Sequence, residues 1–447
     1  MTGKTMAERE VLDCDLIVIG GGMAGMTAAA RAAEAGARVV VVEKAPQIGG
    51  SAVLSGGYVW TATSQAEIDR HDDGDTALHR VVIEEYPHVM DWLRQRMEAG
   101  PPVRALYGRG QQVDMWSYMR FCTRVVEGAG GFVVPGTEVA QILMDNGAVA
   151  GAITTHPDGE TELRAPRILL ATGGFQADPD LRAQHIHPAA RTMRLRSNPH
   201  STGGGMRLGL AAGGAVAGPN SGYYGHLLAR GCPMRGDSDF VRYTQYHSIH
   251  GVLLNRLGQR FCDESFDDHA SSQMTLRQPG AVALLVWDDE VQRTHGVVPV
   301  VAGAEASDRH RDAIQAGCPG GVFDTLEAVG AFAGSLGYDG AACVASLTAY
   351  NDLMRRAPDQ ARPPRETNAR PLDRGPWYVL EVDSAITFTY CGLSTDDQAR
   401  ALDPFGAPIP GLFVAGADIG NAYRKGYAGG LALAATFAFR AMRSAGF

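Results

Sequence analysis

The chain has 447 residues, of which 45% are hydrophobic and 20% charged, and its formal net charge is −9. This length is more than one small core needs, and it predicts a globular protein with two or three domains. The negative charge, with Lys and Arg dispersed along the chain, argues against a nucleic acid as the main partner.

Seven cysteines are scattered along the sequence without a CxxC or CxxCH motif. This spacing supports neither a disulfide framework nor an iron–sulfur or c-type haem site, and we expect no metal. No apolar run reaches the roughly 18 residues of a membrane span, and the charged residues 1–15 do not resemble a signal peptide. The sequence therefore predicts a cytoplasmic protein with reduced thiols and no membrane span.

The first predicted elements lie in residues 15–44. An apolar run at 16–19 predicts a buried strand, and an alanine-rich stretch that ends near residue 35 predicts a helix. A second apolar run at 39–42 predicts another buried strand. A strand–helix–strand unit of this kind is typical of dinucleotide-binding proteins.

A GxGxxG motif joins the first strand to the helix. Gly20 permits a tight turn, Gly22 lets a pyrophosphate approach the backbone, and Gly25 lets helix and strand pack closely. The N-terminus of the helix offers amide groups and the positive end of its dipole to an anion. Glu43 follows the second strand, where a carboxylate can bind a ribose diol. Together these residues predict a bound dinucleotide.

The loop after this unit contains two Gly-Gly pairs next to small hydroxyl side chains. Its sequence includes Gly49-Gly50-Ser51 and then Ser55-Gly56-Gly57. The amides and hydroxyls of such a loop can surround a phosphate and a flat ring.

The chain continues with helices expected at 78–100 and 114–129. Alternating strands at 137–143 and 149–155 are joined by Asn146-Gly147, a typical hairpin turn. The apolar stretch 167–175 ends in a glycine turn, and we expect its strand to lie beside strand 16–19, near the same ligand. Glycines at 203–205 begin another predicted helix.

Aromatic and histidine residues become frequent from about residue 218, and the region to about 368 predicts a second, mixed α and β domain. The dinucleotide-like pattern then returns. A predicted strand at 412–418 ends in a glycine and Asp418, whose carboxylate can bind a hydroxylated chain such as ribitol. Residues 426–431 lead into a final helix that ends near residue 443, with its positive N-terminus available to an electron-rich group.

The order of these motifs resembles the FAD-dependent fumarate reductase/succinate dehydrogenase flavoprotein superfamily, which includes 3-ketosteroid dehydrogenases and tricarballylate dehydrogenase-like proteins. The matching stretches are IVIGGGMAG (17–25), VVEKAPQIGGSAVLSGG (41–57), ILLATGGF (168–175), STGGGMRLG (201–209), LLNRLGQRFCDES (253–265), and PIPGLFVAGADIG with GYAGGLALA (408–434). The resemblance implies an α/β fold with a Rossmann-like (GR2-type) FAD-binding domain made from residues 1–225 and 369–447. An α+β capping domain at 226–368 is inserted between the two parts.

The resemblance also implies that these stretches bind FAD. Some members attach FAD covalently through a His after the early Gly-Gly pair, but Ser51 follows Gly50 here, so we expect non-covalent FAD. The residues expected to contact FAD are Gly20, Gly22, Met23, Ala24, Glu43, Lys44, Gly50, Ser51, Ser55, Gly56, Gly57, Val139, Ala171, Thr172, Gly173, Thr202, Gly205, Gly416, Asp418, Gly430, Leu431 and Ala432.

Three charged groups with which fumarate reductases bind a dicarboxylate are missing from their usual positions. The Arg four residues after the Glu of the RF-x-x-E sequence, here Glu264, is replaced by Asp268. A His is replaced by Phe388, and a late Arg is replaced by Tyr427. We therefore expect neither fumarate nor succinate as the substrate.

Tyr427 is similar to a tyrosine that 3-ketosteroid dehydrogenases place before their last helix. In those enzymes its hydroxyl and a backbone amide about four residues later, here that of Leu431, polarise a ketone oxygen, which acidifies the α-hydrogen. The steroid enzymes have a tyrosine base at the position of Asp268. The resemblance therefore places the base at Asp268 or its neighbour His269.

Further catalytic candidates carry alternatives. His226 resembles a His of tricarballylate dehydrogenase-like proteins, but it can equally be a structural histidine. Tyr390 lies on a strand that reaches the flavin in the family, and Tyr118, on an amphipathic helix, can be a core residue instead. Candidates that line the capping domain are Tyr243, Tyr246 and His247.

These features predict an FAD-dependent dehydrogenase that introduces a C=C bond α,β to the carbonyl of a cyclic or steroid-like ketone, with hydride passing to flavin N5. The partners expected are a small-molecule substrate and an external electron acceptor, because no second GxGxxG unit indicates bound NAD(P). Alternatives are oxidation of a polycarboxylate anchored by Arg424 and Lys425, the reverse reduction of an activated alkene, and a flavin-binding module without catalysis.

Overall fold

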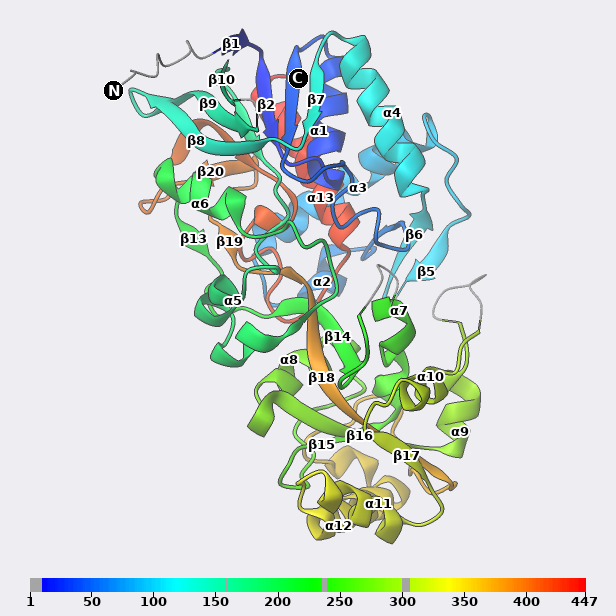
Figure 1. Cartoon of the computed structure of the whole chain (residues 1–447). Coiled ribbons are helices and arrows are strands. Elements are labelled where there is room, and N and C mark those ends of the chain that lie inside the picture. Colours follow the sequence, from blue (N-terminus) through cyan, green and yellow to red (C-terminus); the bar gives the residue numbers. More distant parts are fainter. Residues whose placement is uncertain (1–9, 106, 158, 235–238, 300–305) are drawn as a thin grey trace, which may run out of the picture. The chain divides into compact units, whose positions relative to one another are not determined.

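The computed structural model describes residues 10–447 except 106, 158, 235–238 and 300–305. The described residues form two compact units, whose elements are labelled in Figure 1. The first unit contains the chain up to Ile186, Ser197–Gly222 and Phe388–Phe447, and the second contains His187–Arg196 and Tyr223–Thr387. This division differs from the expected ranges, because residues 187–196, 223–225 and 369–387 belong to the second unit.

The principal sheet of the first unit has six strands, and five of them are parallel in the order β21, β11, β2, β3 and β7. β20 pairs antiparallel with β21 at the edge. Ile168 pairs with Ile17, so the strand predicted within 167–175 does lie beside strand 16–19. The strands are β2 (Leu16–Ile19), β3 (Val39–Glu43), β7 (Phe132–Pro135), β11 (Ile168–Leu170), β20 (Arg400–Leu402) and β21 (Pro408–Val414).

Helices cover this sheet, which explains why its central strands are continuous apolar runs. Every residue of β2 and β3 is buried. The alanine-rich helix α1 (Met23–Glu34) packs against α4 (Met115–Gly128) and α13 (Gly430–Ala445), and α13 packs against α3 (Thr76–Arg94). Small side chains on α1 allow this close approach, and the helices predicted at 78–100 and 114–129 are confirmed as α3 and α4.

The predicted hairpin is also confirmed. β8 (Glu138–Asp145) and β9 (Ala148–His156) pair antiparallel, and Asn146 and Gly147 have φ of 49° and 82°, as a two-residue hairpin turn requires. They form a sheet with β10 (Gly159–Arg164) and β1 (Glu10–Asp13).

The remaining elements of the first unit are short. A small sheet contains β4 (Tyr58–Thr61), β6 (Gly108–Gln112) and β5 (Val103–Ala105), and β13 (Val216–Ala217) pairs with β19 (Gly392–Leu393). The helices are α2 (Gln65–His71), α5 (Pro179–His185), α6 (Gly204–Ala211) and the 3₁₀ turn η6 (Gly416–Asp418).

The second unit is built on the long strand β18 (Trp377–Thr389), whose last two residues belong to the first unit. β18 pairs with β12 (Arg194–Leu195), β14 (Tyr223–Ala229), β16 (Val282–Asp288) and β17 (Gly320–Phe323), and β16 pairs with β15 (Val252–Leu254). This pairing is the physical reason why residues 187–196 and 369–387 join the second unit. All of β16 is buried, and Trp287 is the largest side chain of the core.

Helices surround this mixed sheet. The α-helices are α7 (Asp239–Tyr243), α8 (Asp268–Leu276), α9 (Asp289–Val291), α10 (Arg309–Gln315), α11 (Leu326–Ser335) and α12 (Gly340–Arg356). Shorter turns are η1 (Pro188–Thr192), η2 (Tyr246–His250), η3 (Pro279–Ala281), η4 (Gln292–Gly296) and η5 (Pro358–Gln360). Among the described residues, no helix combines the length and apolar character that crossing a membrane requires.

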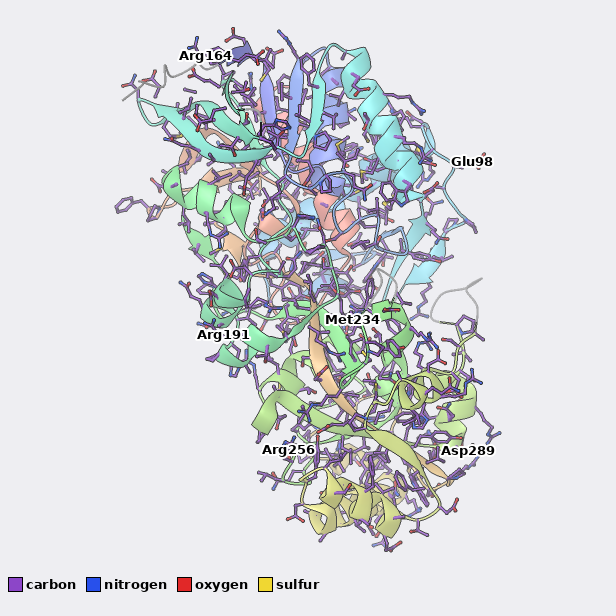
Figure 2. All side chains as sticks on the ribbon, in the orientation of Figure 1. Glu98, Arg164, Arg191, Met234, Arg256 and Asp289 are labelled. Carbon is purple, nitrogen blue, oxygen red and sulfur yellow. The ribbon has the colours of Figure 1, made fainter. Side chains whose placement is uncertain are left out.

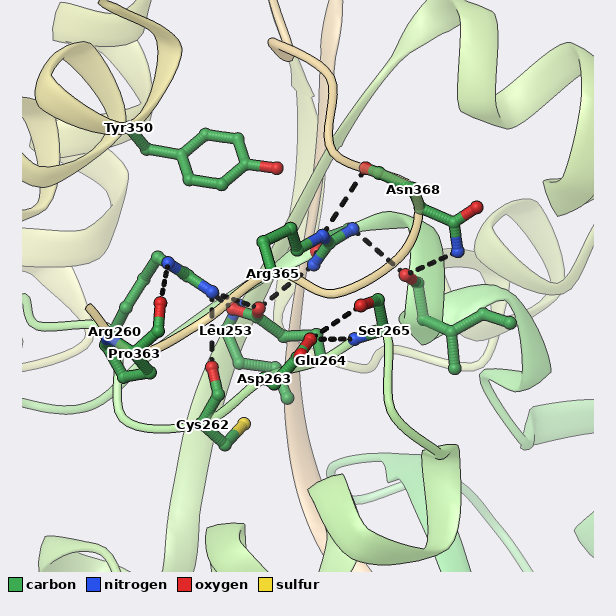
Figure 3. A network of polar contacts seen from close by, with 12 residues as sticks. Leu253, Arg260, Cys262, Asp263, Glu264, Ser265, Tyr350, Pro363, Arg365 and Asn368 are labelled. Atoms are coloured by element: carbon green, nitrogen blue, oxygen red, sulfur yellow. Dashed lines mark hydrogen bonds and ion pairs between the residues drawn. The ribbon is translucent and has the colours of Figure 1, made fainter. Parts of the chain in front are cut away.

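A buried ion-pair network holds the segment before α8 in place (Figure 3). Most charged side chains, such as Glu98 and Arg164 in Figure 2, are exposed, but that of Glu264 is fully buried. Its carboxylate accepts hydrogen bonds from Leu253 N at 3.0 Å, from Arg260 Nη2 at 2.6 Å and from Arg365 Nη1 at 2.9 Å. The Glu of the RF-x-x-E sequence is therefore an anchor within the second unit.

We expect Glu264→Gln to lower the free energy of unfolding by about 3–5 kcal/mol, because Arg260 and Arg365 would lose their buried counter-charge. Urea unfolding followed by circular dichroism measures this loss. The control is Asp352→Asn, which breaks an exposed pair with Arg355 and should change stability by less than about 0.5 kcal/mol. Equal losses in the two variants would contradict the anchoring role.

Candidate active site

Three helices of the first unit begin at glycine and have no side-chain cap: α1 at Gly22, α6 at Gly203 and α13 at Gly429. Amides in the first turn of a helix lack partners within the helix. The uncapped starts therefore leave such amides, and the positive end of the dipole, to other groups. Side chains cap the other α-helices of this unit, α2 to α5: Ser64, Asp75, Asp114 and Asp178.

The turn at the start of α1 is closely packed at two of its glycines and open at the third. Gly20 has φ of 111°, and a Cβ there would lie 2.2 Å from the carbonyl oxygen of Ala171. A Cβ on Gly25 would lie 1.9 Å from the oxygen of Gly20, so both positions require glycine. In contrast, a Cβ on Gly22 would meet no atom within 4 Å. The backbone at Gly22 is thus open to a ligand, as the sequence predicts.

Further predicted contact residues surround this turn. A Cβ on Gly50 would lie 3.5 Å from Gly22 Cα, so the second glycine loop faces the first. A Cβ on Gly416 would lie 3.2 Å from Cβ of Ala24, which follows Met23 in the first turn of α1. The two ends of the chain therefore meet at the start of α1.

Glu43 and Lys44 lie at the end of β3. The buried carboxylate of Glu43 accepts hydrogen bonds from the amides of Gly21 and Ala45, both at 2.7 Å. A carboxylate has further acceptor sites, so binding of a ribose diol by Glu43 stays a prediction. Lys44 Nζ donates to Thr202 Oγ1 at 2.6 Å, and both residues line an open surface pocket with Glu138 and His200.

The hydroxyl groups of the second glycine loop form hydrogen bonds with other residues of the first unit. Ser51 Oγ and Ser197 Oγ are 2.6 Å apart. Ser55 Oγ donates to the carbonyl of Ala52 and accepts from the amide of Gly57. Gly56 precedes Gly57, whose φ is 72° and which has no room for a Cβ beside the carbonyl of Val113. The hydroxyl groups of this loop are therefore engaged in hydrogen bonds within the chain.

Asp418 is buried and organises the loop after β11. Its carboxylate accepts from the amide and hydroxyl of Thr172 and from the amide of Gly174, and Thr172 Oγ1 in turn accepts from the amide of Gly205. Gly173 has φ of 89° within this loop. Burial raises the pKa of Asp418, although these hydrogen bonds oppose the effect. The predicted contact with ribitol is not tested by this arrangement.

Tyr427 lies at the start of α13. Its phenolic oxygen accepts a hydrogen bond from the amide of Gly430 at 2.9 Å. Gly430 and Leu431 are partly exposed, whereas Ala432 and the residues that follow it to Phe439 are buried. The phenol is thus held beside an accessible helix N-terminus, as the resemblance implies for a ketone-binding pair.

Aromatic rings surround Tyr427. Its ring centroid lies 5.4 Å from that of Trp60, 5.9 Å from Phe388 and 6.0 Å from Tyr423. Tyr390 extends this cluster through contacts with Phe388 and Tyr423. The cluster gives Tyr427 an apolar environment, in which hydrogen bonds to a ligand are stronger than in water.

Asp72 holds the loop that precedes Tyr427. Its Oδ1 atom accepts from the amides of Arg424, Lys425 and Gly426, at 2.8 to 2.9 Å, and its Oδ2 atom lies 3.1 Å from His79 Nε2. Burial raises the pKa of Asp72, but the hydrogen bonds from His79 and the three amides outweigh it and hold the pKa below its usual value. The side chains of Arg424 and Lys425 are exposed, so they do not form buried anchors for a polycarboxylate.

The other catalytic candidates form a buried cluster in the second unit, which we call the histidine cluster: His226, Asp268 and His269. Asp268 Oδ2 lies 2.7 Å from His226 Nδ1, and Asp268 Oδ1 lies 3.1 Å from His269 Nδ1. His269 Nδ1 also lies 3.0 Å from the carbonyl of Gly225, so this nitrogen carries a proton. Ligand atoms of the cluster lie within 4.8 Å of one another, which would also suit a metal ion.

Tyr224 belongs beside the histidine cluster, although the sequence did not single it out. Its hydroxyl lies 3.2 Å from His226 Nε2, and its ring centroid lies 4.5 Å from that of His269. Burial lowers the pKa of His226 well below its usual value, and electrostatic interactions with Arg196 and His269 add to the effect. His226 is therefore neutral at physiological pH, and its Nε2 atom can accept a hydrogen bond from the hydroxyl of Tyr224.

Two predicted residues lie elsewhere in the first unit. Tyr118 is fully buried on α4, its hydroxyl lies 2.7 Å from Thr27 Oγ1 on α1, and its ring contacts Trp92. We assign Tyr118 to the helix core rather than to catalysis, because it is separate from the aromatic cluster. Val139 lies on β8 at a shift in the pairing with β9. Trp60, which contacts Tyr427, gave no signal in the sequence because it lies just after the second glycine loop, outside the motif.

Comparisons with known proteins show the family to which the chain belongs. The family described as "FAD binding domain" matches residues 15–431. The chain is 26% identical to a fumarate reductase (cytochrome) of Shewanella frigidimarina, over 95% of this chain and 75% of that protein. It is 25% identical to 4-oxocyclohexanecarboxylate 2-dehydrogenase of Sinomonas cyclohexanicum, over 93% of this chain and 89% of that protein.

A solved structure shares the fold. The 3-ketosteroid-Δ4-(5α)-dehydrogenase of Rhodococcus jostii RHA1, in complex with 4-androstene-3,17-dione, has a TM-score of 0.77 and 21% identity. The match covers 99% of this chain and 98% of that one. The mixed α/β architecture of the whole chain is therefore that of a known flavoprotein group.

We expect Gly22→Ala to fold but to bind FAD at least tenfold more weakly. The added methyl group meets no protein atom, and Gly22 has φ of −84°, so the loss of stability should stay within about 1 kcal/mol. Flavin absorbance per protein and the unfolding midpoint of FAD-free protein measure the two effects. Gly128→Ala, at another position with open space, is the control and should retain FAD. Normal FAD content in Gly22→Ala would contradict the assignment.

Asp267, the N-cap of α8, should make the free energy of unfolding depend on pH. Burial raises its pKa from 3.8 to about 6, so the folded chain holds a proton that the unfolded chain releases. The free energy of unfolding should therefore fall as pH rises from about 4 to about 6 through this group. In Asp267→Asn, which keeps a capping side chain, that part of the decrease should vanish in urea unfolding at pH 4, 5, 6 and 7. Parallel pH profiles of the two proteins would refute the shift.

Proposed function

The chain belongs to the FAD-binding flavoprotein family, and on this premise we propose that it is an FAD-dependent dehydrogenase that introduces a C=C bond α,β to the carbonyl of a cyclic ketone. The observation that carries the proposal is the position of Tyr427 beside the accessible N-terminus of α13. The reaction class is oxidoreduction at CH–CH groups.

FAD fits the first unit. The parallel sheet with its glycine turns supports a Rossmann-like, GR2-type binding mode. The open backbone at Gly22 and the start of α1 would bind the pyrophosphate, and Glu43, Lys44 and Thr202 would bind the adenosine end. Ser51 follows Gly50 and binds Ser197, so FAD would be held without a covalent bond. When bound, FAD supplies an acceptor for the hydride that leaves the β carbon.

Tyr427 and α13 would activate the ketone. The phenol accepts from the amide of Gly430, and this bond polarises the phenol so that its own O–H is a stronger donor. The O–H of Tyr427 and the amide of Leu431 would both donate to the ketone oxygen. These donors stabilise the charge that develops as the α-proton leaves, helped by the positive end of the helix dipole.

The histidine cluster is the candidate general base within the second unit. Asp268 contacts both His226 and His269, and burial keeps His226 neutral, although its lowered pKa makes it a weaker base than a free imidazole. His226 Nε2 faces the hydroxyl of Tyr224, and a proton can pass between these two groups.

Two relatives support a ketone substrate. The names of the Sinomonas dehydrogenase and the Rhodococcus steroid dehydrogenase both describe cyclic ketones. A polycarboxylate bound by Arg424 and Lys425 is not supported, because these side chains are exposed and their amides bind Asp72.

We expect Tyr427→Phe to lower kcat/KM for ketone oxidation at least 100-fold, because the variant loses one of two donors to the developing oxyanion. FAD content should stay unchanged. Anaerobic bleaching of the flavin absorbance by cyclohexanone and by 4-oxocyclohexanecarboxylate measures the rate. Tyr118→Phe, a change in the helix core, is the control and should keep wild-type kinetics.

Two outcomes would contradict the proposal. One is an absence of bleaching by any saturated cyclic ketone, including steroid ketones. The other is equal bleaching rates in Tyr427→Phe and the wild-type protein.

A further inference from the structure

The first unit contains a buried histidine, His79 on α3, that lies between two aspartates. Its side chain is only 1% exposed. Nδ1 lies 3.2 Å from Asp69 Oδ1, and Nε2 lies 3.1 Å from Asp72 Oδ2. Nε2 also lies 2.8 Å from the carbonyl oxygen of Ala422. His79 therefore connects the end of α2 to the loop that leads to Tyr427.

The hydrogen bonds of His79 require a proton on each ring nitrogen. A carbonyl oxygen can only accept, so Nε2 donates to Ala422. Asp69 Oδ1 also accepts from Gln65 Nε2 at 2.8 Å, as an ionised carboxylate does, so Nδ1 donates to it. An imidazole with two N–H groups is a cation. Burial lowers the pKa of His79, but the hydrogen bonds to Asp72 and Asp69 outweigh it and raise the pKa above its usual value.

The charge of His79 compensates the buried charge of Asp72. The side chain of Asp72 is fully buried, and its carboxylate accepts from the amide of Gly74 as well as from those of residues 424–426. Amides carry no net charge, and a buried carboxylate is costly unless a positive charge pairs with it. Tyr423 also faces His79, with ring centroids 6.1 Å apart, but burial raises the pKa of this phenol well above its usual value, so it stays neutral.

His79 and Asp72 together hold the loop that ends at Tyr427. Asp72 accepts from three successive amides of this loop, and His79 donates to a carbonyl at its start. The loop is closely packed, since a Cβ on Gly426 would lie 2.3 Å from the carbonyl oxygen of the last residue of α2. Tyr427 follows directly, so a shift of the loop would move its phenol away from the start of α13.

We propose that His79 is a positioning residue for Tyr427, because its imidazolium pairs with Asp72 and so fixes the loop that places the phenol at the start of α13. This inference rests on the proposed function of Tyr427, but the charge of His79 and its effect on the loop can be measured without a substrate. The loop is held at pH values below the pKa of His79 and is released as the pH rises through it, because Asp72 then loses its counter-charge.

The first test needs no substrate. We expect NMR of FAD-loaded protein labelled at its histidine nitrogens to show both ring nitrogens of His79 protonated at neutral pH. Hydrogen exchange at the amides of residues 424–426 should be about tenfold faster or more in His79→Gln, because Asp72 loses its counter-charge. His88→Gln, which changes an exposed histidine of the same helix, is the control and should keep the wild-type exchange rates.

The second test measures the oxidation of 4-oxocyclohexanecarboxylate against pH. We expect kcat/KM to fall with rising pH at the pKa that NMR gives for His79. Asp69→Asn removes an exposed carboxylate, so in this variant the fall should move to lower pH by about 0.5 pH unit. His79→Gln should lose this pH dependence, with kcat about tenfold lower or more and KM little changed, since the phenol acts mainly in the transition state. His88→Gln should keep the wild-type profile.

The contrary results are distinct. A neutral His79 at neutral pH, or unchanged exchange at residues 424–426 in His79→Gln, would overturn the inference. If His79→Gln does not fold, the profile of Asp69→Asn decides, and an unshifted profile would overturn the inference. If His79 is charged and holds the loop but Tyr427→Phe oxidises the ketone as fast as the wild type, the proposed function fails and the role of His79 in the loop remains. If Tyr427→Phe is impaired and His79→Gln keeps the wild-type profile, the inference fails and the proposed function remains.

Discussion

Helix N-termini that no side chain caps are the constraint on which the first unit depends. Side chains cap the first-turn amides of α2 to α5, whereas the positive φ of Gly203 and Gly429, 82° and 97°, and the atoms next to them exclude a capping side chain there. Because glycine has no side chain, the first-turn amides of α1, α6 and α13 are available to other groups. At α6 the partner of Gly205 is Thr172, and at α13 the partner of Gly430 is Tyr427. At α1 the backbone at Gly22 is open, and we propose that the phosphate groups of FAD bind there.

In the second unit, most buried charged side chains form ion pairs with side chains of opposite charge. Glu264 compensates two arginines in the network before α8, which fixes the segment from which Asp268 and His269 follow. Against this background the buried, neutral His226 is informative. Burying a titratable group is costly, and such groups are concentrated at functional sites, where they bind a ligand or transfer a proton.

The sequence predicted what is encoded locally. The strands around the glycine turns, the hairpin at Asn146-Gly147 and the position of Tyr427 before α13 depend on patterns of a few residues. The pairing of the strand within 167–175 with strand 16–19 was predicted, but most contacts between distant segments were not. The amides held by Asp72, for example, come from residues 424–426. The second unit also takes residues 369–387, because β18 pairs with β16 and β17, and no composition change marks that pairing. Tyr118 could not be told from a catalytic residue until its hydrogen bond to Thr27 was known.

The most direct test of the account is a crystal structure of the FAD-loaded protein with 4-hydroxybenzoate, whose phenolate resembles the enolate of a cyclic ketone. The account predicts that the phenolate oxygen lies within about 3 Å of both Tyr427 Oη and the amide nitrogen of Leu431. A phenolate bound away from the start of α13, with Tyr427 making no contact to it, would contradict the central claim.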